Sequence, residues 1–162
     1  MKAFVQRTIG KCSIEIEKNG KKSDHGFSGV GLVVLLGWLE SDLANPKLEE
    51  AEDWILSRVL GLRVFEDKDA KMNLNLADYA QHNKLSSGIF WVSQFTLAAE
   101  LDSGFRPSFI RAMNPLAAQT RYMQFCNKIE KNSPHQNYMG VFGANMKLSF
   151  TNWGPVSIML EK

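Results

Sequence analysis

The chain has 162 residues and a formal net charge of +2, with 44% hydrophobic and 22% charged residues. This balance is typical of one globular domain, and it permits nucleic acid as a partner without requiring it. Two isolated cysteines and three histidines share no ligand spacing, which argues against a disulfide framework and against a metal site. No apolar run reaches membrane-spanning length and no signal-peptide pattern is present, so we expect a cytoplasmic protein without a membrane association.

The first predicted elements are β-strands. Residues 2–7 indicate one strand, and residues 12–17 follow with strict alternation between apolar and polar side chains. Asn19-Gly20, the strongest short signal for a hairpin turn, comes next. Residues 29–38 are apolar without alternation, which is typical of a central strand that is buried on both faces.

A helix is predicted at Asn45-Pro46, where Asn would be the N-cap and Pro would occupy the first turn. Gly61 marks the expected end of this helix. Its apolar face would comprise Leu48, Ala51, Ile55 and Val59. Two short strands are expected over residues 63–66 and 72–76, joined by a polar turn.

The next segment is predicted to be an expanded loop over residues 77–88, and residues 88–97 indicate another buried strand. Asn114-Pro115 repeats the helix start and leads into a second amphipathic helix. The apolar residues of this helix include Leu116, Met123 and Ile129. Residues 127–137 are polar and are interpreted as a loop within the domain.

Two final strands, residues 146–150 and 156–160, flank the segment "TNWGPVS" at residues 151–157. An ordinary turn would also explain this segment, because Gly-Pro usually marks turns. Strands outnumber helices in this interpretation. We therefore predict an α/β fold: a single mixed α/β domain over residues 1–162, with a curled or doubled, barrel-like β-sheet and two main helices packed outside.

Polar residues gather at the predicted end of the strand over residues 88–97. Ser93, Gln94 and Thr96 offer two hydroxyls and an amide around Phe95. Strand ends commonly carry functional sites, although such hydroxyls also serve simply to cap the backbone. No motif His or Asp stands beside them, so neither a Ser-His-Asp triad nor a nucleophile elbow is indicated.

Two further segments are candidates for ligand binding. In "GFRPSF" (residues 104–109), Arg106 precedes Pro107 and would present its guanidinium to a phosphate or carboxylate, unless it is only a surface residue of a loop. The glycines of "GVFGANM" (residues 140–146) superficially resemble a phosphate loop. This segment lacks the Lys-Ser/Thr of that motif and leads into a strand, so nucleotide binding is rejected.

Together and in this order, the motifs resemble the D-aminoacyl-tRNA deacylases, formerly called D-tyrosyl-tRNA deacylases. The resemblance covers nearly the whole chain, through "AFVQR", "GLVVLLG", "LRVFEDKDAKMNL", "VSQFTL", "GFRPSF", "GVFGANMKLSF" and "NWGPVS". "SQFTL" and "NxGPV" are specific signatures of that family.

The resemblance implies a homodimeric carboxylic ester hydrolase that proofreads translation by cleaving the ester between a D-amino acid and the 3′ end of tRNA. Ser93, Gln94, Phe95 and Thr96 match the segment that lines the reaction site, and Met146 matches a substrate-binding position. Gly154 and Pro155 match a Gly-cisPro pair that reaches across the dimer interface into the partner's pocket, and Arg7 matches an arginine that holds the pair in place.

Such a pair would act as a rigid gate, because backbone atoms would contact the α-ammonium group and leave no room for an L side chain. The gate predicts activity on many D-aminoacyl-tRNAs and on glycine mischarged on tRNA(Ala). We expect no cofactor, no metal and no covalent intermediate, with an oxyanion hole from backbone N–H groups near Phe95 and Thr96. Thr96 as a nucleophile stays open, although the sequence supplies no base for it.

Two departures from the family pattern stand out. Ser157 occupies a position where Thr is usual, and Asp102 lies in a loop where relatives usually carry basic residues, which predicts weaker tRNA contact there. Two alternatives remain: a non-catalytic tRNA-binding dimer, and a related deacylase that acts on L-aminoacyl-tRNA through a trans Gly-Pro. The intact "SQFT" and "GP" segments argue against the first. Phe95 within "SQFTL" and the "NxGPV" context argue against the second.

Overall fold

The fold is built on one five-stranded mixed sheet with the strand order β6-β5-β2-β1-β7, in a computed structural model that describes residues 1–102 and 104–162. Strands β1, β2 and β7 are antiparallel neighbours, whereas β2, β5 and β6 run parallel to one another. The strand bounds are β1 Lys2–Lys18, β2 Lys21–Gly37, β5 Ser87–Ser93, β6 Gln136–Met139 and β7 Asn145–Glu161. Because β6 and β7 are the two edges, the sheet is open and does not close into a barrel.

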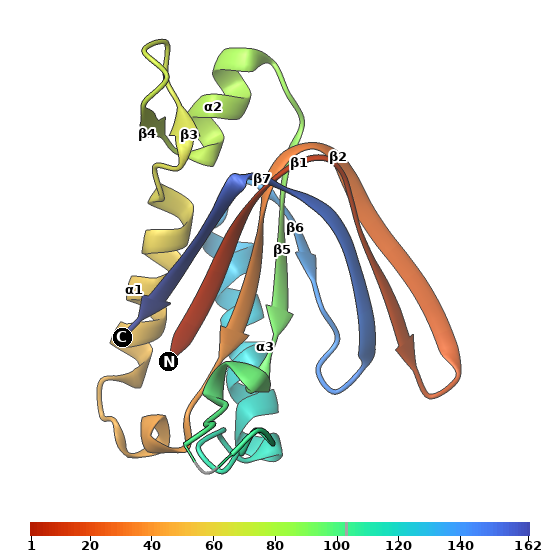
Figure 1. Cartoon of the computed structure of the whole chain (residues 1–162), viewed down its shortest axis with the longest axis vertical. Coiled ribbons are helices and arrows are strands. Elements are labelled where there is room, and N and C mark those ends of the chain that lie inside the picture. Colours follow the sequence, from red (N-terminus) through yellow and green to blue (C-terminus); the bar gives the residue numbers. More distant parts are fainter. Residues whose placement is uncertain (103) are drawn as a thin grey trace.

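Among the described residues, three α-helices and a small hairpin accompany the sheet. Helices α1 (Leu48–Gly61) and α3 (Pro115–Asn132) cover one face of the sheet, while α2 (Leu76–Asn83) lies at one end beside the hairpin of β3 (Phe65–Glu66) and β4 (Met72–Leu74) (Figure 1). The expected mixed α/β domain is thus confirmed, with one helix more than predicted.

The sheet is strongly bent, which creates two apolar clusters. Strands β1, β2 and β7 all bend sharply along their length (Figure 1). Near the middle of β1, Gly10 pairs with Gly29 of β2, and their φ angles are 81° and 149°. Such angles favour glycine. The larger cluster fills the space between the sheet and helices α1 and α3. The smaller one lies under the returning half of the hairpin and contains Cys12, Ile14, Ile16, Phe27, Val33, Phe90 and Val92.

Several sequence predictions are confirmed. The alternating stretch over residues 12–17 buries its apolar residues, and Asn19-Gly20 forms the turn between β1 and β2 with φ angles of 51° and 74°. Residues 29–37 lie in β2, the central strand. Asn114 caps α3, since its side chain accepts a hydrogen bond from the amide N–H of Ala117 at 3.0 Å.

Several boundaries are wrong in the sequence interpretation. Residues 2–7 and 12–17 belong to one continuous strand, and the last two predicted strands are both part of β7. Helix α1 begins at Leu48, because Asn45 closes a preceding 3₁₀ turn and its side chain accepts from the amide N–H of Lys47. The strand over residues 88–97 ends at Ser93 and continues as a second 3₁₀ helix, η2 (Phe95–Ala98).

Two predicted loops are also corrected. Residues 77–88 contain most of helix α2, and residues 127–137 contain the end of α3 and the start of β6. The predicted apolar face of α3 is wrong in part, because Leu116 and Met123 are 80% and 58% exposed. The residues of α3 that are buried against the sheet are Tyr122, Phe125 and Ile129.

A buried ionic network joins α1 to α3. The carboxylate of Glu52, on α1, is fully buried and accepts from the indole N–H of Trp38 at 3.0 Å. Arg121, on α3, donates two hydrogen bonds to the same carboxylate from its Nε and one terminal nitrogen, and Lys128 lies 3.6 Å away. A buried charge is tolerated only when it is paired in this manner.

We expect Glu52→Ala to lower the free energy of unfolding by about 3 kcal/mol, because it leaves Arg121 and the Trp38 N–H without their partner. Urea denaturation measures this loss. Glu49→Ala is the matched control, since Glu49 is 77% exposed and 3.9 Å from Arg121. The control should cost less than about 1 kcal/mol, and an equal loss in both variants would contradict the structural role of Glu52.

Candidate functional site

A cavity of about 650 Å³ lies where the parallel strands β2 and β5 end side by side. The chain leaves β5 here, and the amide N–H of Gln94 donates to the carbonyl oxygen of Leu36 at 2.7 Å. The carboxyl ends of parallel strands are common places for ligand sites. The lining residues are Leu36, Gly37, Trp38, Val92, Ser93, Gln94, Phe95, Phe109, Ala112, Met113, Asn114, Pro115, Ala118, Phe142, Gly143, Ala144, Asn145, Met146 and Leu148.

Three of the four residues in the predicted site segment Ser93–Thr96 line this cavity. Ser93, Gln94 and Phe95 line it, whereas Thr96 is exposed beside it and is not among the lining residues. Phe95 is 59% exposed, and its ring contacts that of Phe109 edge-on at 5.0 Å between centroids. The first N–H groups of η2 are those of Phe95 and Thr96, and the first N–H groups of a helical turn have no partner within it.

Thr96 has an amide as its side-chain partner. The Nε2 of Gln94 donates to the Thr96 Oγ1. An amide donor cannot take the hydroxyl proton, so this contact does not activate Thr96 as a nucleophile. The arrangement instead fixes the turn around Phe95.

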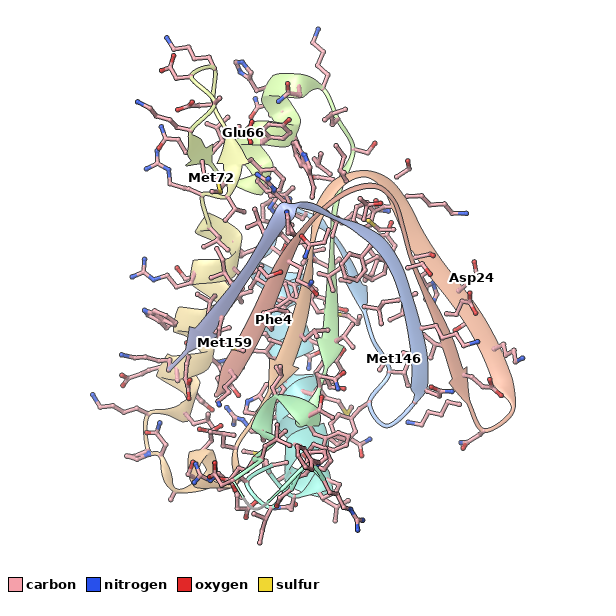
Figure 2. The ribbon with its side chains drawn as sticks, in the orientation of Figure 1. Phe4, Asp24, Glu66, Met72, Met146 and Met159 are labelled. Atoms are coloured by element: carbon pink, nitrogen blue, oxygen red, sulfur yellow. The ribbon has the colours of Figure 1, made fainter. Side chains whose placement is uncertain are left out.

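The opposite wall of the cavity comes from the connection between β6 and β7. Met146 is a lining residue on β7, and its sulfur lies 3.1 Å from where a Cβ of Gly140 would be, so glycine leaves room for it. Figure 2 shows Met146 at the start of β7, near this connection. The Tyr122 hydroxyl lies 2.8 Å from the carbonyl oxygen of Gly140 and 2.9 Å from that of Trp91, and burial raises the pKa of Tyr122, so it stays a donor.

The segment "NWGPVS" forms a bulge in the edge strand β7. Thr8 pairs with Asn152 and Gln6 pairs with Ser157, so four residues of β7 lie opposite Arg7 alone. Within this bulge the Gly154-Pro155 bond is cis, and both residues are exposed. The segment is therefore a local projection from a continuous strand, and the ordinary-turn interpretation is wrong.

Two side chains hold the bulge in shape. Asn152 spans it from within β7: its Oδ1 accepts from the amide N–H of Val156 at 3.0 Å, and its Nδ2 donates to the Ser157 hydroxyl at 3.0 Å. Arg7 supports it from β1, since its Nε donates to the carbonyl oxygen of Trp153 at 2.9 Å. Ser157 thus supplies a hydroxyl that accepts from the Asn152 side chain.

Arg7 is nearly completely buried, with 3% of its surface exposed. Burial lowers the pKa of its guanidinium, while Glu66 and Tyr79 oppose this effect. The guanidinium also donates to the carbonyl oxygen of Val64 and lies 4.4 Å from the centroid of the Trp153 ring. Arg7 is therefore tied both to the bulge and to the connection between α1 and β3.

The predicted site residues fall into two groups within one chain. Ser93, Gln94, Phe95 and Met146 meet at the cavity, but Arg7 and the exposed bulge do not line it. The bulge lies at the bent end of the sheet and η2 at the opposite end of β5 (Figure 1). Arg106 is exposed and also lies outside the lining. Sequence reasoning missed the aromatic walls Trp38, Phe109 and Phe142.

Neither a metal-binding cluster nor a membrane-spanning helix is present in the part of the chain that the structure describes. Over residues 1–102 and 104–162 there is no group of three or more His, Cys, Asp or Glu side chains that could hold a metal ion. None of the helices formed by this part of the chain is long and apolar enough to cross a membrane.

Comparison with known proteins identifies the class to which this fold and site belong. The family model described as D-Tyr-tRNA(Tyr) deacylase matches residues 5–161. A D-aminoacyl-tRNA deacylase of Flavobacterium psychrophilum is 38% identical over 81% of this chain and 80% of its own length. That of Christiangramia forsetii is 33% identical over 99% of this chain and 97% of its own.

The structural comparison agrees over the full length. A solved structure of a c-Myc DNA unwinding element binding protein superimposes with a TM-score of 0.77 at 32% identity, covering 100% of this chain and 99% of that one. The chain therefore belongs to the D-Tyr-tRNA(Tyr) deacylase family, as its sequence motifs indicated.

We expect Asn152→Ala to loosen the bulge without unfolding the sheet, because it removes the acceptor of the Val156 amide and the partner of Ser157. The Val156 amide should exchange with deuterium about tenfold faster, since local openings set such rates. Hydrogen exchange measured by NMR gives the rate. Asn132→Ala, which removes an exposed contact on α3, is the control and should leave Val156 unchanged.

Proposed function

We propose that the protein is a homodimeric D-aminoacyl-tRNA deacylase of the cytoplasm, which hydrolyses the ester between a D-amino acid and the 3′ end of tRNA. The observation that carries this proposal is the combination of an open cavity at Ser93–Phe95 with an exposed, braced bulge at Gly154–Pro155, in a chain that belongs to this family. The partner is aminoacyl-tRNA, bound through its 3′ end, and neither a metal nor a cofactor takes part.

The reaction needs little chemistry from side chains. An aminoacyl ester is activated, and the neighbouring ribose hydroxyl assists its hydrolysis. Water attacks the carbonyl carbon, the bond to the ribose oxygen breaks, and the products are the free amino acid and tRNA. The N–H groups of Phe95 and Thr96 would stabilise the developing oxyanion, so positioning and a pre-formed oxyanion hole supply the catalysis.

Selectivity would come from the bulge. Backbone carbonyl oxygens at Gly154 would accept from the α-ammonium group, and the rigid backbone would exclude any L side chain from its Cβ onward. A D side chain points away, and glycine has none, so the proposal includes cleavage of glycine mischarged on tRNA(Ala). A fitted apolar pocket would behave differently, because it distinguishes one methylene by only about 1–3 kcal/mol.

A second copy is needed because the cavity and the bulge are separate within one chain. Phe4 pairs with Leu35 on one side and with Met159 on the other, which places three apolar side chains in a row across β2, β1 and β7. Their neighbours Ala3 and Val5 are buried against the helices, so this row lies on the opposite face. Figure 2 shows Phe4 and Met159 on that uncovered face, and Met159 is 49% exposed. We propose that this face contacts the second copy.

Two alternatives are less well supported. A non-catalytic tRNA-binding dimer has no need for the braced bulge or for the open cavity at Ser93–Phe95. A deacylase for L-aminoacyl-tRNA would need room for an L side chain beside Gly154. The substrate experiment below separates all three functions.

The protein is expected to hydrolyse D-Tyr-tRNA, D-Asp-tRNA and Gly-tRNA, and to leave L-Ala-tRNA nearly untouched. Loss of labelled amino acid from each tRNA, followed in buffer with EDTA, measures the rates. A rigid steric gate predicts similar rates for the two D substrates, within about tenfold. Rapid cleavage of L-Ala-tRNA, activity on a single D-amino acid, or a requirement for added metal would contradict the proposal.

We expect Gly154→Ala to reduce D-aminoacyl-tRNA hydrolysis at least about tenfold, since small displacements of positioning groups have such effects. The φ angle of Gly154 is 121°, and an added Cβ would lie 2.7 Å from a terminal nitrogen of Arg7 and 2.9 Å from the Val156 Cγ2. The methyl group would therefore displace the support of the bulge.

Mixing this variant with Phe95→Ala tests whether the bulge acts across a dimer. Random exchange of subunits restores one intact site in each hybrid dimer, so an equal mixture should recover about a quarter of the wild-type rate. The two variants measured apart are the controls. No recovery after subunit exchange would show that cavity and bulge do not act across two copies.

A further inference from the structure

An aromatic layer lies directly behind the bulge. Trp153, the residue before Gly154, packs against Tyr79 on α2 with 5.9 Å between ring centroids, and Tyr79 stacks on Phe65 on β3 at 5.0 Å with an interplanar angle of 28°. Phe65 and Trp153 are 6.4 Å apart. Three elements that are distant in sequence therefore meet at one point beneath the exposed Gly154.

Arg7 connects this layer to the backbone on both sides. Its guanidinium lies 4.4 Å from the Trp153 ring centroid and 6.0 Å from that of Phe65. The same group donates to the carbonyl oxygens of Trp153 and of Val64, the residue that precedes Phe65. A shift of the aromatic layer would therefore move a hydrogen-bond donor of the bulge as well as its packing surface.

Helix α2 is itself firmly anchored. Its inward residues Leu76 and Ala80 are 1% and 6% exposed, and the Asn75 side chain caps its first turn by accepting from the amide N–H of Asp78 at 2.9 Å. Tyr79 lies between these anchors, half-buried, with its ring against Trp153. The helix thus presents the tyrosine ring from a fixed position.

We propose that Tyr79 and Trp153 are positioning residues, which set how far the Gly154–Pro155 bulge projects and thereby control discrimination between D- and L-aminoacyl-tRNA. This inference rests on the proposed function. It gives a role to residues 76–83, which lie far from the cavity at Ser93–Phe95. Simple core packing would affect stability, whereas positioning of the bulge changes the ratio of the two rates.

The first test is Tyr79→Leu, compared with Tyr79→Phe. The leucine variant loses the ring that supports Trp153, and its ratio of D-Tyr-tRNA to L-Tyr-tRNA hydrolysis should fall about tenfold or more, as expected when positioning is relaxed. The phenylalanine variant keeps the ring and should retain the wild-type ratio. Deuterium exchange of the Val156 amide, which reports the bulge directly, should accelerate only in the leucine variant.

The second test uses a matched tryptophan. Trp54, on α1, lies under Arg58 with 5.3 Å between the guanidinium carbon and the ring centroid, which is a similar contact remote from the bulge. Trp153→Leu should reduce the D-to-L ratio, whereas Trp54→Leu should lower the unfolding midpoint in urea and leave the ratio unchanged. Both measurements are made on the full chain.

Three outcomes separate the hypotheses. A wild-type protein without D-Tyr-tRNA hydrolysis would contradict the proposed function itself. A wild-type protein that discriminates, with Tyr79→Leu and Trp153→Leu variants that discriminate equally well, would overturn only the positioning role. A ratio that falls equally in Trp54→Leu would also overturn it, because the effect would then follow general stability.

Discussion

The buried guanidinium of Arg7 is the contact on which the arrangement of this protein depends. A charged group placed among apolar side chains must find hydrogen-bond partners, and Arg7 donates to the carbonyl oxygens of Trp153 and Val64. Those carbonyls belong to the bulge of β7 and to the connection between α1 and β3. One side chain of β1 therefore couples the edge of the sheet to the elements at its end, and neither neighbour can relax independently.

Separation of the cavity from the bulge limits what one chain can do. The cavity end of the fold offers backbone N–H groups and aromatic walls, while the bulge end offers a rigid, exposed backbone. Neither end carries an activated nucleophile or general base among the residues described. Catalysis by positioning is consistent with such a site, because an activated ester requires little more than orientation and stabilisation of charge.

The sequence predicted those features that short-range patterns encode. Alternation placed residues 12–17 on the correct faces, Asn19-Gly20 located the hairpin, and Asn114 located the start of α3. Helix α2 was missed because it buries only the pair Leu76 and Ala80, which is too short a stripe for a periodic signal. The strand interpretation failed after Ser93 because the chain turns away where β5 ends.

Candidate site residues were named from the sequence only where they belong to a motif of the family. The predicted site residues Ser93, Gln94, Phe95 and Met146 line the cavity, but Trp38 and Phe109 enter through long-range packing that no local pattern records. Gly154 is likewise separated from the cavity because the sheet bends, and no local sequence pattern records that bend. Arg7 contacts Trp153 and Val64, which lie 146 and 57 positions away in the chain. Contacts at such separations could not be predicted from the spacing of residues in the sequence.

The bulge also bears on the behaviour of β7 in a crowded solution. The edge strand β7 has 17 residues, and its outer side carries N–H and C=O groups that no strand of this sheet pairs with. Such an edge can pair with a strand of another molecule and so promote aggregation. Pro155 has no N–H to donate, and the four residues opposite Arg7 interrupt the regular ladder. The bulge that we propose to distinguish D- from L-amino acids thus also interrupts the edge at which a foreign strand would pair.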